Sequence, residues 1–121
     1  MASQSPAKSR TERIAQLNDR CRQGLDRTAQ IVVTRNCLAR LAPSGDKVDE
    51  IVAQAEIMQA VRQATFDPDS PERDIAAVTV RETKLFFKID YYDSNVEYGS
   101  EDPADAAMTT RMLTIMLPED Y

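Results

Sequence analysis

The sequence contains no histidine among its 121 residues. Without an imidazole the chain cannot form a Ser-His-Asp or Cys-His nucleophile pair, a histidine metal site or a histidine proton-transfer group. Glycine is nearly as scarce, because Gly24, Gly45 and Gly99 are the only three. The sequence therefore has no glycine-rich loop that would cradle a phosphate group. These absences exclude many common catalytic chemistries.

Cysteine is also sparse, with only Cys21 and Cys37. The two residues form no C-x-x-C pair and have no histidine to complete a ligand set, so we expect no zinc site. Cys21 falls on the apolar stripe of an expected helix, where cysteine behaves as a small buried hydrophobe. A disulfide between the two is not expected, because the sequence shows no secretory signal.

Long apolar runs are missing as well. No stretch of about 18 apolar residues occurs, so we expect no membrane-spanning segment. Residues 1–9 lack the apolar centre of a secretory signal, which makes the cytoplasm the expected location. We expect these residues to form a disordered N-terminal tail, and residues 10–121 to form a single α+β domain.

The composition is that of a soluble globular protein, with 42% hydrophobic and 29% charged residues and a net charge of −5. Charge is distributed unevenly along the chain. Residues 1–30 hold six basic and three acidic residues, whereas residues 91–121 hold seven acidic residues and one basic residue, Arg111. General nucleic-acid binding is not expected, because phosphate contacts need clustered lysine and arginine.

Two segments have the apolar periodicity of helices. Ile14, Leu17 and Cys21 recur at spacings of three and four, which predicts a helix over about residues 11–24 with Ser9 or Thr11 as its cap. A second helix is predicted over about residues 46–64. Its apolar residues trace one face, the face that an amphipathic helix turns to the core: Val48, Ile51, Val52, Ala55, Met58 and Val61.

Four segments have the patterns of strands, over residues 28–35, 75–81, 84–92 and 109–117. The second and third are joined by a tight turn near Glu82 and Thr83, which indicates an antiparallel hairpin. The last is apolar on both faces, as a covered central strand would be. The order of elements predicts an α+β fold: an antiparallel sheet of about four strands with two helices packed on one face.

An acidic segment with flanking tyrosines is the main candidate for a binding surface. Six acidic residues and no basic residue lie between Lys88 and Arg111: Asp90, Asp93, Glu97, Glu101, Asp102 and Asp105. Exposed tyrosines beside carboxylates are typical of protein-binding surfaces. We expect a protein partner to contact Tyr92, Asp93, Glu97, Tyr98, Glu101, Asp102 and Asp105. The alternative is a solvated acidic loop with no binding role.

The same segment resembles a calcium-binding loop only at its start. The run Asp93-x-Asn95-x-Glu97 matches the first three ligand positions of such a loop. Tyr98 then stands where a glycine is required, and Ala104 stands where the bidentate glutamate is required. The sequence therefore predicts no calcium site here.

A magnesium site on Asp90 and Asp93 would need a phosphate substrate and a basic clamp, for which Arg111 is the only nearby candidate. Glycosidase-like work by paired carboxylates is also conceivable, but acidic pairs are too common to point to it. We predict no catalytic residue, no metal and no cofactor. A carboxylate-based, metal-dependent enzyme is the least favoured alternative.

Several stretches carry a resemblance to one family. The C-terminal stretches are Phe87-Lys-Ile-Asp-Tyr-Tyr-Asp93, Glu97-Tyr-Gly-Ser-Glu-Asp-Pro103 and Thr109-Thr-Arg-Met-Leu-Thr-Ile-Met-Leu117. Two further stretches are Arg13-Ile-Ala-Gln-Leu-Asn-Asp19 and Val32-Val-Thr-Arg35. The chain resembles the bacterial domain-of-unknown-function family numbered 3768 over most of residues 11–121.

This resemblance implies no chemistry, because the family has no agreed activity. It implies an accessory protein of plasmids and integrative elements, of the kind found near anti-restriction genes. From this context we expect an anti-defence inhibitor (anti-CRISPR or anti-restriction) that binds a nucleic-acid-handling complex such as a CRISPR effector or a restriction enzyme. A homodimeric regulatory or assembly module is the alternative.

Overall fold

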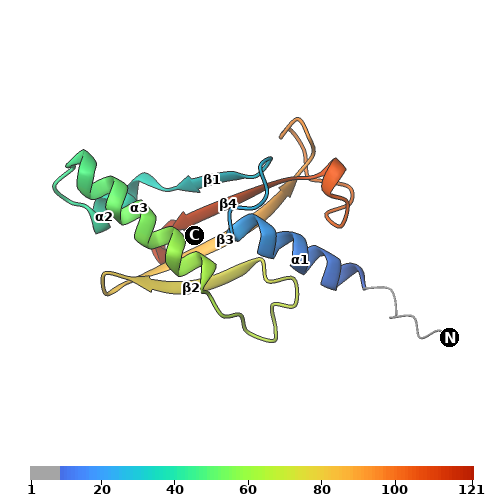
Figure 1. Ribbon diagram of the computed structural model, residues 1–121, viewed down its shortest axis with the longest axis horizontal. Coiled ribbons are helices and arrows are strands. Elements are labelled where there is room, and N and C mark those ends of the chain that lie inside the picture. The colour runs from blue at the N-terminus through green and yellow to red at the C-terminus, as the bar shows by residue number, and fades with distance from the viewer. Residues whose placement is uncertain (1–8) are drawn as a thin grey trace.

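The computed structural model describes residues 9–121. The expected tail therefore lies outside the described residues apart from Ser9, whose hydroxyl caps the first helix by accepting a hydrogen bond from the Glu12 amide. The elements follow in the order α1 (Arg10–Arg22), β1 (Gln30–Val33), α2 (Arg35–Leu41), α3 (Lys47–Arg62), β2 (Ile75–Val80), β3 (Thr83–Tyr92), η1 (Ala106–Met108), β4 (Thr110–Met116) and η2 (Pro118–Asp120) (Figure 1). No helix within residues 9–121 is both long enough and apolar enough to cross a membrane.

The sheet has four strands in the order β1-β4-β3-β2, and the α+β class is confirmed. Strands β2, β3 and β4 pair antiparallel, but β1 pairs parallel with β4, with Ile31 opposite Leu113 and Val33 opposite Ile115. The expectation of a purely antiparallel sheet is therefore wrong. A short hairpin forces antiparallel pairing only between neighbours in sequence, and β1 reaches β4 across a long connection that permits either direction.

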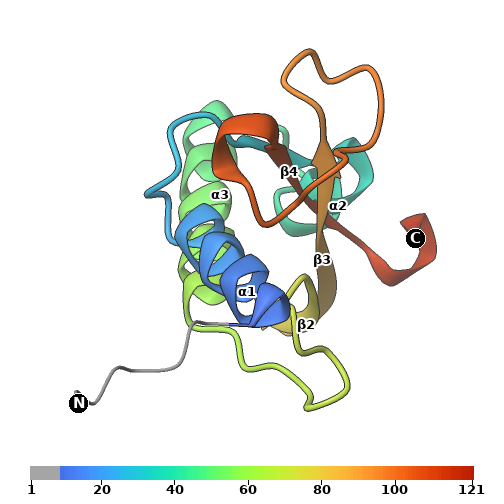
Figure 2. The same ribbon diagram turned by 90° about the vertical axis from the view of Figure 1, so that its right-hand side faces the viewer.

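Helices α1 and α3 lie on one side of the sheet, and the opposite side is called the open side below (Figure 2). A third helix, α2, was not predicted. Thr34 begins it, because its hydroxyl accepts a hydrogen bond from the Cys37 amide at 3.2 Å. This helix packs against α3 and β4, so it closes one end of the core.

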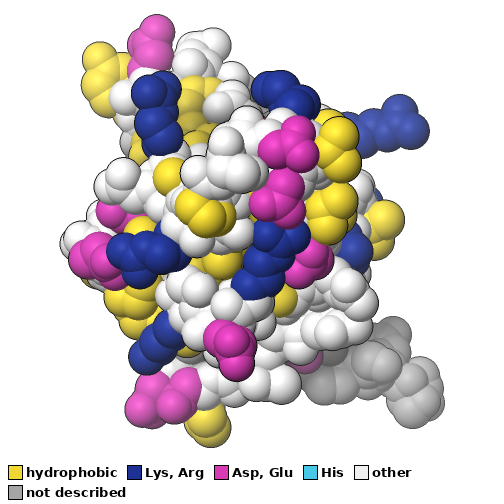
Figure 3. Space-filling view, turned by 90° about the vertical axis from the view of Figure 1, so that its left-hand side faces the viewer, with side chains coloured by type: hydrophobic (Ala, Val, Ile, Leu, Met, Phe, Trp, Pro, Cys, Tyr) yellow, Lys and Arg dark blue, Asp and Glu magenta, His cyan; other side chains and the backbone are white. Residues whose placement is uncertain are grey.

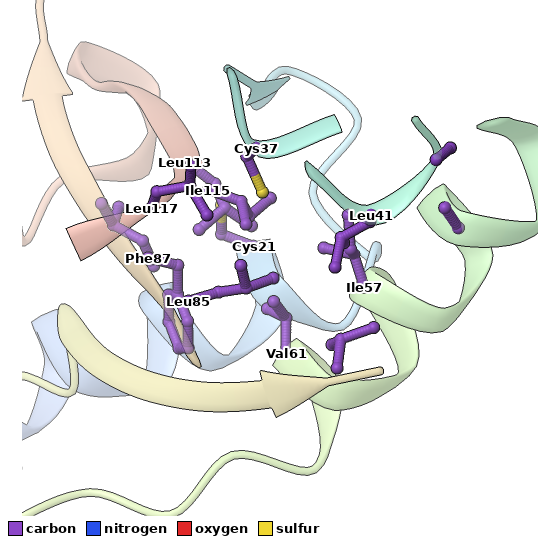
Figure 4. Packing of buried hydrophobic residues seen from close by; sticks show 14 residues of the cluster. Cys21, Cys37, Leu41, Ile57, Val61, Leu85, Phe87, Leu113, Ile115 and Leu117 are labelled. Atoms are coloured by element: carbon purple, nitrogen blue, oxygen red, sulfur yellow. The ribbon is translucent and has the colours of Figure 1, made fainter. Parts of the chain in front are cut away.

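The core lies between the sheet and the helices (Figure 4). Alternate residues of β3 and β4 point into it, among them Phe87 and Leu113, as the alternation predicts. Cys21 and Cys37 are both fully buried and free, and Cys21 lies in the core as expected. Burial raises the pKa of both thiols to about 11, so neither is a reactive thiolate at neutral pH.

Helix α3 has two apolar stripes rather than one. Ala53, Ile57 and Val61 are buried against the sheet. Val48, Ile51 and Val52 are 67%, 59% and 45% exposed, and Ala55 is exposed as well. The expectation that these four residues belong to the face turned to the core is therefore wrong.

Ion pairs attach one flank of α3 to the turn between β2 and β3. Arg81, in the turn between β2 and β3, contacts Asp49 at 3.1 Å and Glu56 at 2.9 Å. The same arginine donates a hydrogen bond to the Leu41 carbonyl at the end of α2. These contacts agree with the rotation of the helix that buries Ala53, Ile57 and Val61. The apolar spacing alone does not distinguish its two stripes.

The turn between β2 and β3 consists of Arg81 and Glu82, with φ of 50° and 63°. Both residues therefore have the left-handed conformation that two-residue hairpin turns require. The tight turn is confirmed, one residue earlier than predicted. The loop of residues 67–74 that precedes β2 is tied to α1, because Arg73 contacts Asp19 at 2.6 Å.

Candidate functional site

The segment from Asp93 to Thr109, called the acidic loop below, connects β3 to β4 and projects beyond the end of the sheet (Figures 1 and 2). Its first part continues the hairpin. Tyr92 is bridged to Gly99, the Asp93 amide donates to the Tyr98 carbonyl at 2.8 Å, and the Ser100 amide donates to the Tyr91 carbonyl at 3.0 Å. The loop thus starts from a rigid strand pair.

The tip of the acidic loop is closed by the Asp93 side chain. Its Oδ1 accepts hydrogen bonds from the backbone amides of Asn95 at 3.1 Å and Glu97 at 3.0 Å. The run that resembles the start of a calcium loop is therefore a turn in which Asp93 binds its own backbone. Its carboxylate has a structural role and is only partly free to meet a partner.

The second half of the acidic loop is also held by internal hydrogen bonds. The Ser100 and Thr109 hydroxyls are 2.7 Å apart, and Thr109 donates to the Asp102 carbonyl at 2.9 Å. The Asp102 and Asp105 carboxylates accept from the backbone amides two residues further on, and Asp105 thereby caps η1. The loop therefore has a defined shape before any partner arrives.

Arginines fasten the acidic loop to the domain. Arg13 of α1 donates to the Ala104 carbonyl at 2.7 Å, and Arg111 of β4 donates to the Pro103 carbonyl. Arg10 contacts Asp102 at 3.1 Å in an exposed ion pair, which contributes little to stability. Part of the arginine-rich first helix thus serves the acidic loop of its own chain.

Arg111 is almost fully buried, at 1% exposure, and no ion pair with a carboxylate is formed by it within residues 9–121. Its Nε donates to Asn18 Oδ1 at 2.7 Å, and its guanidinium lies 5.1 Å from the centre of the Tyr91 ring. Asn18 donates to the Tyr91 hydroxyl, which donates to Glu72. Desolvation lowers the pKa of Arg111, and this hydrogen-bonded chain offsets part of that cost.

The residues proposed for a magnesium site lie apart. Arg111 points to the helix side of the sheet, whereas Asp90 lies on the open side and pairs with Lys88 at 2.9 Å. Asp93 is occupied by its own turn. No group of three or more cysteine, aspartate or glutamate side chains that could hold a metal ion occurs in the described part of the chain.

The exposed part of the acidic loop combines apolar and acidic side chains. Tyr98 is 73% exposed and Met108 is 43% exposed. Glu97 and Glu101 are exposed too, and neither forms a side-chain ion pair with any residue from 9 to 121. A hollow of about 370 Å³ in the acidic loop is lined by Asp93, Ser94, Tyr98, Gly99, Glu101, Ala107 and Met108.

The seven residues expected to bind a partner fall into three groups in the structure. Asp93, Tyr98 and Glu101 line the hollow, and Glu97 lies on the same hairpin. Asp102 and Asp105 bind the loop backbone. Tyr92 points instead to the open face of the sheet, where it lines a separate hollow with Lys88, Asp90, Met112, Thr114, Met116 and Tyr121.

Two exposed features were missed by the sequence reasoning. Met108 lies in a short polar and alanine-rich run, and nothing in that run signals its exposure. The second feature is the exposed apolar stripe of α3, called the outer stripe below, which consists of Val48, Ile51, Val52 and Ala55. The sequence pattern was recognised but was assigned to the core. The signal that could have corrected the assignment is the presence of apolar residues on both sides of the helix.

Residues 33–120 match the family described as "Protein of unknown function (DUF3768)", which is more than two thirds of the chain. The chain belongs to this family. The match includes the acidic loop and α3, whereas α1 and most of β1 precede it. No curated protein and no solved structure matches the chain. Membership of DUF3768 brings no activity with it, so function must be argued from the surface described above.

Proposed function

We propose that this DUF3768 protein is a cytoplasmic, non-catalytic interaction protein whose acidic loop binds a basic surface of a nucleic-acid-handling protein. One observation supports this most directly. A loop held in shape by its own hydrogen bonds presents Tyr98 and Met108 beside Glu97 and Glu101. Exposed aromatic and methionine side chains supply contact area, and unpaired carboxylates supply charge complementarity.

The basic partner surface follows from the chemistry of the loop. Surfaces that bind nucleic acid carry clustered lysine and arginine for phosphate contacts, and carboxylates compete for the same groups. Ten base pairs of duplex present about twenty charges, whereas the segment has only six carboxylates. The loop therefore suits a small basic site better than a long duplex channel.

The specific form of the proposal is an anti-defence inhibitor, anti-CRISPR or anti-restriction, encoded by a mobile genetic element. It rests on the expected context of the family rather than on any contact in the structure. In this form the acidic loop occupies the nucleic-acid site of a CRISPR effector or restriction enzyme. The inhibitor would act by occlusion and would make or break no covalent bond.

The experiment is DNA cleavage by purified CRISPR effectors and restriction enzymes with increasing amounts of the protein. We expect inhibition of at least one enzyme, weakened by added salt because the contact is ionic. The double variant Glu97→Lys, Glu101→Lys should weaken inhibition at least about tenfold. The double variant Asp69→Lys, Glu82→Lys reverses two exposed acidic residues outside the acidic loop and is the matched charge-reversal control.

A negative result is also well defined. If the unmodified protein inhibits no enzyme of the panel and none of these enzymes retains it when immobilised, the anti-defence proposal is wrong. If inhibition occurs but the control variant Asp69→Lys, Glu82→Lys weakens it as much as Glu97→Lys, Glu101→Lys does, then only overall charge matters. The acidic loop would in that case not be the binding surface.

A further inference from the structure

The outer stripe of α3 is an apolar surface that the fold leaves uncovered. Val48, Ile51, Val52 and Ala55 recur at spacings of three and four, so they form one continuous stripe. Successive helix residues differ by about 100°, which places this stripe opposite the buried Ala53 and Ile57. A helix that is apolar on both sides is normally covered on both sides.

The outer stripe is also free of charge. Asp49 and Glu56 lie on the flank of α3 that faces the β2–β3 turn, where both contact Arg81. Glu50 is half-buried on the core side, three residues before Ala53. Figure 3 faces the end of the molecule where α3 begins and shows hydrophobic side chains open to solvent between charged ones. An uncharged stripe fits an apolar protein surface and not nucleic acid.

We propose that a second copy of this chain covers the outer stripe, with the two α3 helices packed antiparallel about a two-fold axis. An axis between Ile51 and Val52 brings Val48 opposite Ala55 of the partner subunit. It also brings Ile51 opposite Val52 of the partner subunit. The stripe is therefore complementary to itself, as a two-fold interface requires, and its small and β-branched side chains allow the close approach of two helices.

The position of the stripe in the molecule supports the same occupant. Each copy has a net charge of −5, so two copies repel each other unless their acidic parts stay apart. Helix α3 begins at one end of the long axis, and the acidic loop lies at the other end (Figure 1). The proposed dimer therefore keeps the two acidic loops apart and exposed. It does not depend on the proposed function.

The size of the outer stripe sets the expected strength of the dimer. Residues 48–55 span about 11 Å of helix, and four side chains per copy bury less than the roughly 1,200 Å² of a stable interface. We therefore expect a dimer whose dissociation constant lies between about 1 and about 100 µM. The monomer then predominates in dilute solution and the dimer at high concentration.

Sedimentation equilibrium from about 5 to about 500 µM measures this dimer directly. We expect a shift from monomer to dimer over that range. Ile51→Glu, which places a carboxylate on the axis, should raise the dissociation constant at least about tenfold. Gln63→Glu adds the same charge at the C-terminal cap of the same helix, about 18 Å along its axis from Ile51, and should change little. Far-UV circular dichroism checks that both variants fold.

A cross-linking experiment fixes the geometry, with the wild type as background because Cys21 and Cys37 are fully buried. In the proposed dimer, cysteines from Val52→Cys lie about 1.5 Å apart along the helix axis, and those from Val48→Cys about 11 Å apart. A short bis-maleimide should therefore link Val52→Cys to itself far better than Val48→Cys. Mixing Val48→Cys with Ala55→Cys should restore an efficient link.

Three results would overturn the proposal. A protein that stays monomeric up to about 500 µM has no second copy on α3. A dimer that Ile51→Glu leaves intact uses another surface, such as the free edge of β1. Equal cross-linking of all three cysteine variants excludes the antiparallel register. None of these results touches the acidic loop, whose own test uses Glu97, Glu101 and inhibition of cleavage.

Discussion

The two ends of the molecule expose apolar side chains in different settings. At one end Tyr98 and Met108 stand among carboxylates on a loop that is tied together by its own hydrogen bonds. At the other end Val48, Ile51 and Val52 stand on a regular helix with no charge on the same stripe. The loop owes its shape to polar contacts with the domain, whereas the helix owes its position to the core on its opposite side.

In both regions the side chains that would contact a partner differ from the side chains that hold the surface in place. Charge and aromatic area at the acidic loop favour a particular partner and steer its approach. An apolar stripe gives attraction without direction, so it suits a partner of matching shape. The side chains that support each surface lie beneath it. They can be altered without touching the surface itself.

The largest expected effect on the free energy of unfolding is a difference between the two apolar stripes of α3. Ile57 is fully buried and Ile51 is 59% exposed on the same helix. Ile57→Ala should lower the free energy of unfolding by about 3 kcal/mol, because it removes buried methylenes and leaves a cavity. Ile51→Ala should change it by less than about 0.5 kcal/mol in dilute solution, where the monomer predominates. Urea unfolding at low micromolar concentration measures both.

The outcome separates the stripes even if the absolute values differ. Similar losses for the two alanine variants at low concentration would mean that the outer stripe is covered within a single chain, contrary to the structure. A loss for Ile51→Ala that grows with protein concentration would instead report the dimer. Comparing two isoleucines of one helix keeps the chemistry of the substitution constant.

The next largest effect concerns Arg111, the buried residue that donates a hydrogen bond to the acidic loop. Arg111→Met keeps the volume but leaves Asn18 Oδ1 and the Pro103 carbonyl without their donor. Two such acceptors cost about 2–3 kcal/mol in total, partly offset by removal of a desolvated cation. We expect a lower urea midpoint and faster amide exchange at Ala104 and Asp105, measured by hydrogen exchange. Unchanged exchange there would mean that the loop keeps its shape without Arg111.

Much of the fold follows from local patterns. The alternation in β3 and β4 and the short connection between β2 and β3 act over a few residues, so the hairpin and the central place of β4 were predicted correctly. The expectation that β4 is covered on both faces is wrong, because Met112 and Thr114 line a hollow on the open side of the sheet. Helix α2 has seven residues, too few for a periodic signal, and depends on the Thr34 cap. The parallel partner of β1 is set by packing across the whole chain. The spacing of apolar residues within the four residues of β1 does not encode this pairing.

The site was predictable in outline but not in its parts. Alternation along β3 places Tyr92 on the side opposite Tyr91, so its separation from the loop residues could have been inferred from the strand pattern. The use of Asp93 as a turn former is also typical of aspartate. The burial of Arg111 was not predictable, because its partners Asn18 and Tyr91 come from distant segments.

The smallest expected effect on the free energy of unfolding concerns the contacts that attach α3 and the acidic loop to α1. Asp19 of α1 binds Arg73 and Arg22, and Arg22 also donates to the Val61 and Arg62 carbonyls at the end of α3. The acidic loop is attached mainly through arginines that donate to carbonyl groups, which do not titrate. Acidification should therefore loosen the α3 attachment and leave the loop attachment in place.

Burial alone would raise the pKa of Asp19, but hydrogen bonds and charge from Arg73 and Arg22 outweigh it, so the pKa is lowered. A lowered pKa means stabilisation that is present above the unfolded value of about 4 and is lost as the pH falls through the folded value. Asp19→Asn should thus cost about 1 kcal/mol at pH 7 in urea unfolding, discounted for partial exposure. The difference from the wild type should begin to narrow near pH 4 and close as the pH falls through the lowered folded pKa. A difference that does not narrow at all between pH 7 and pH 3 would assign the loss to packing rather than to charge.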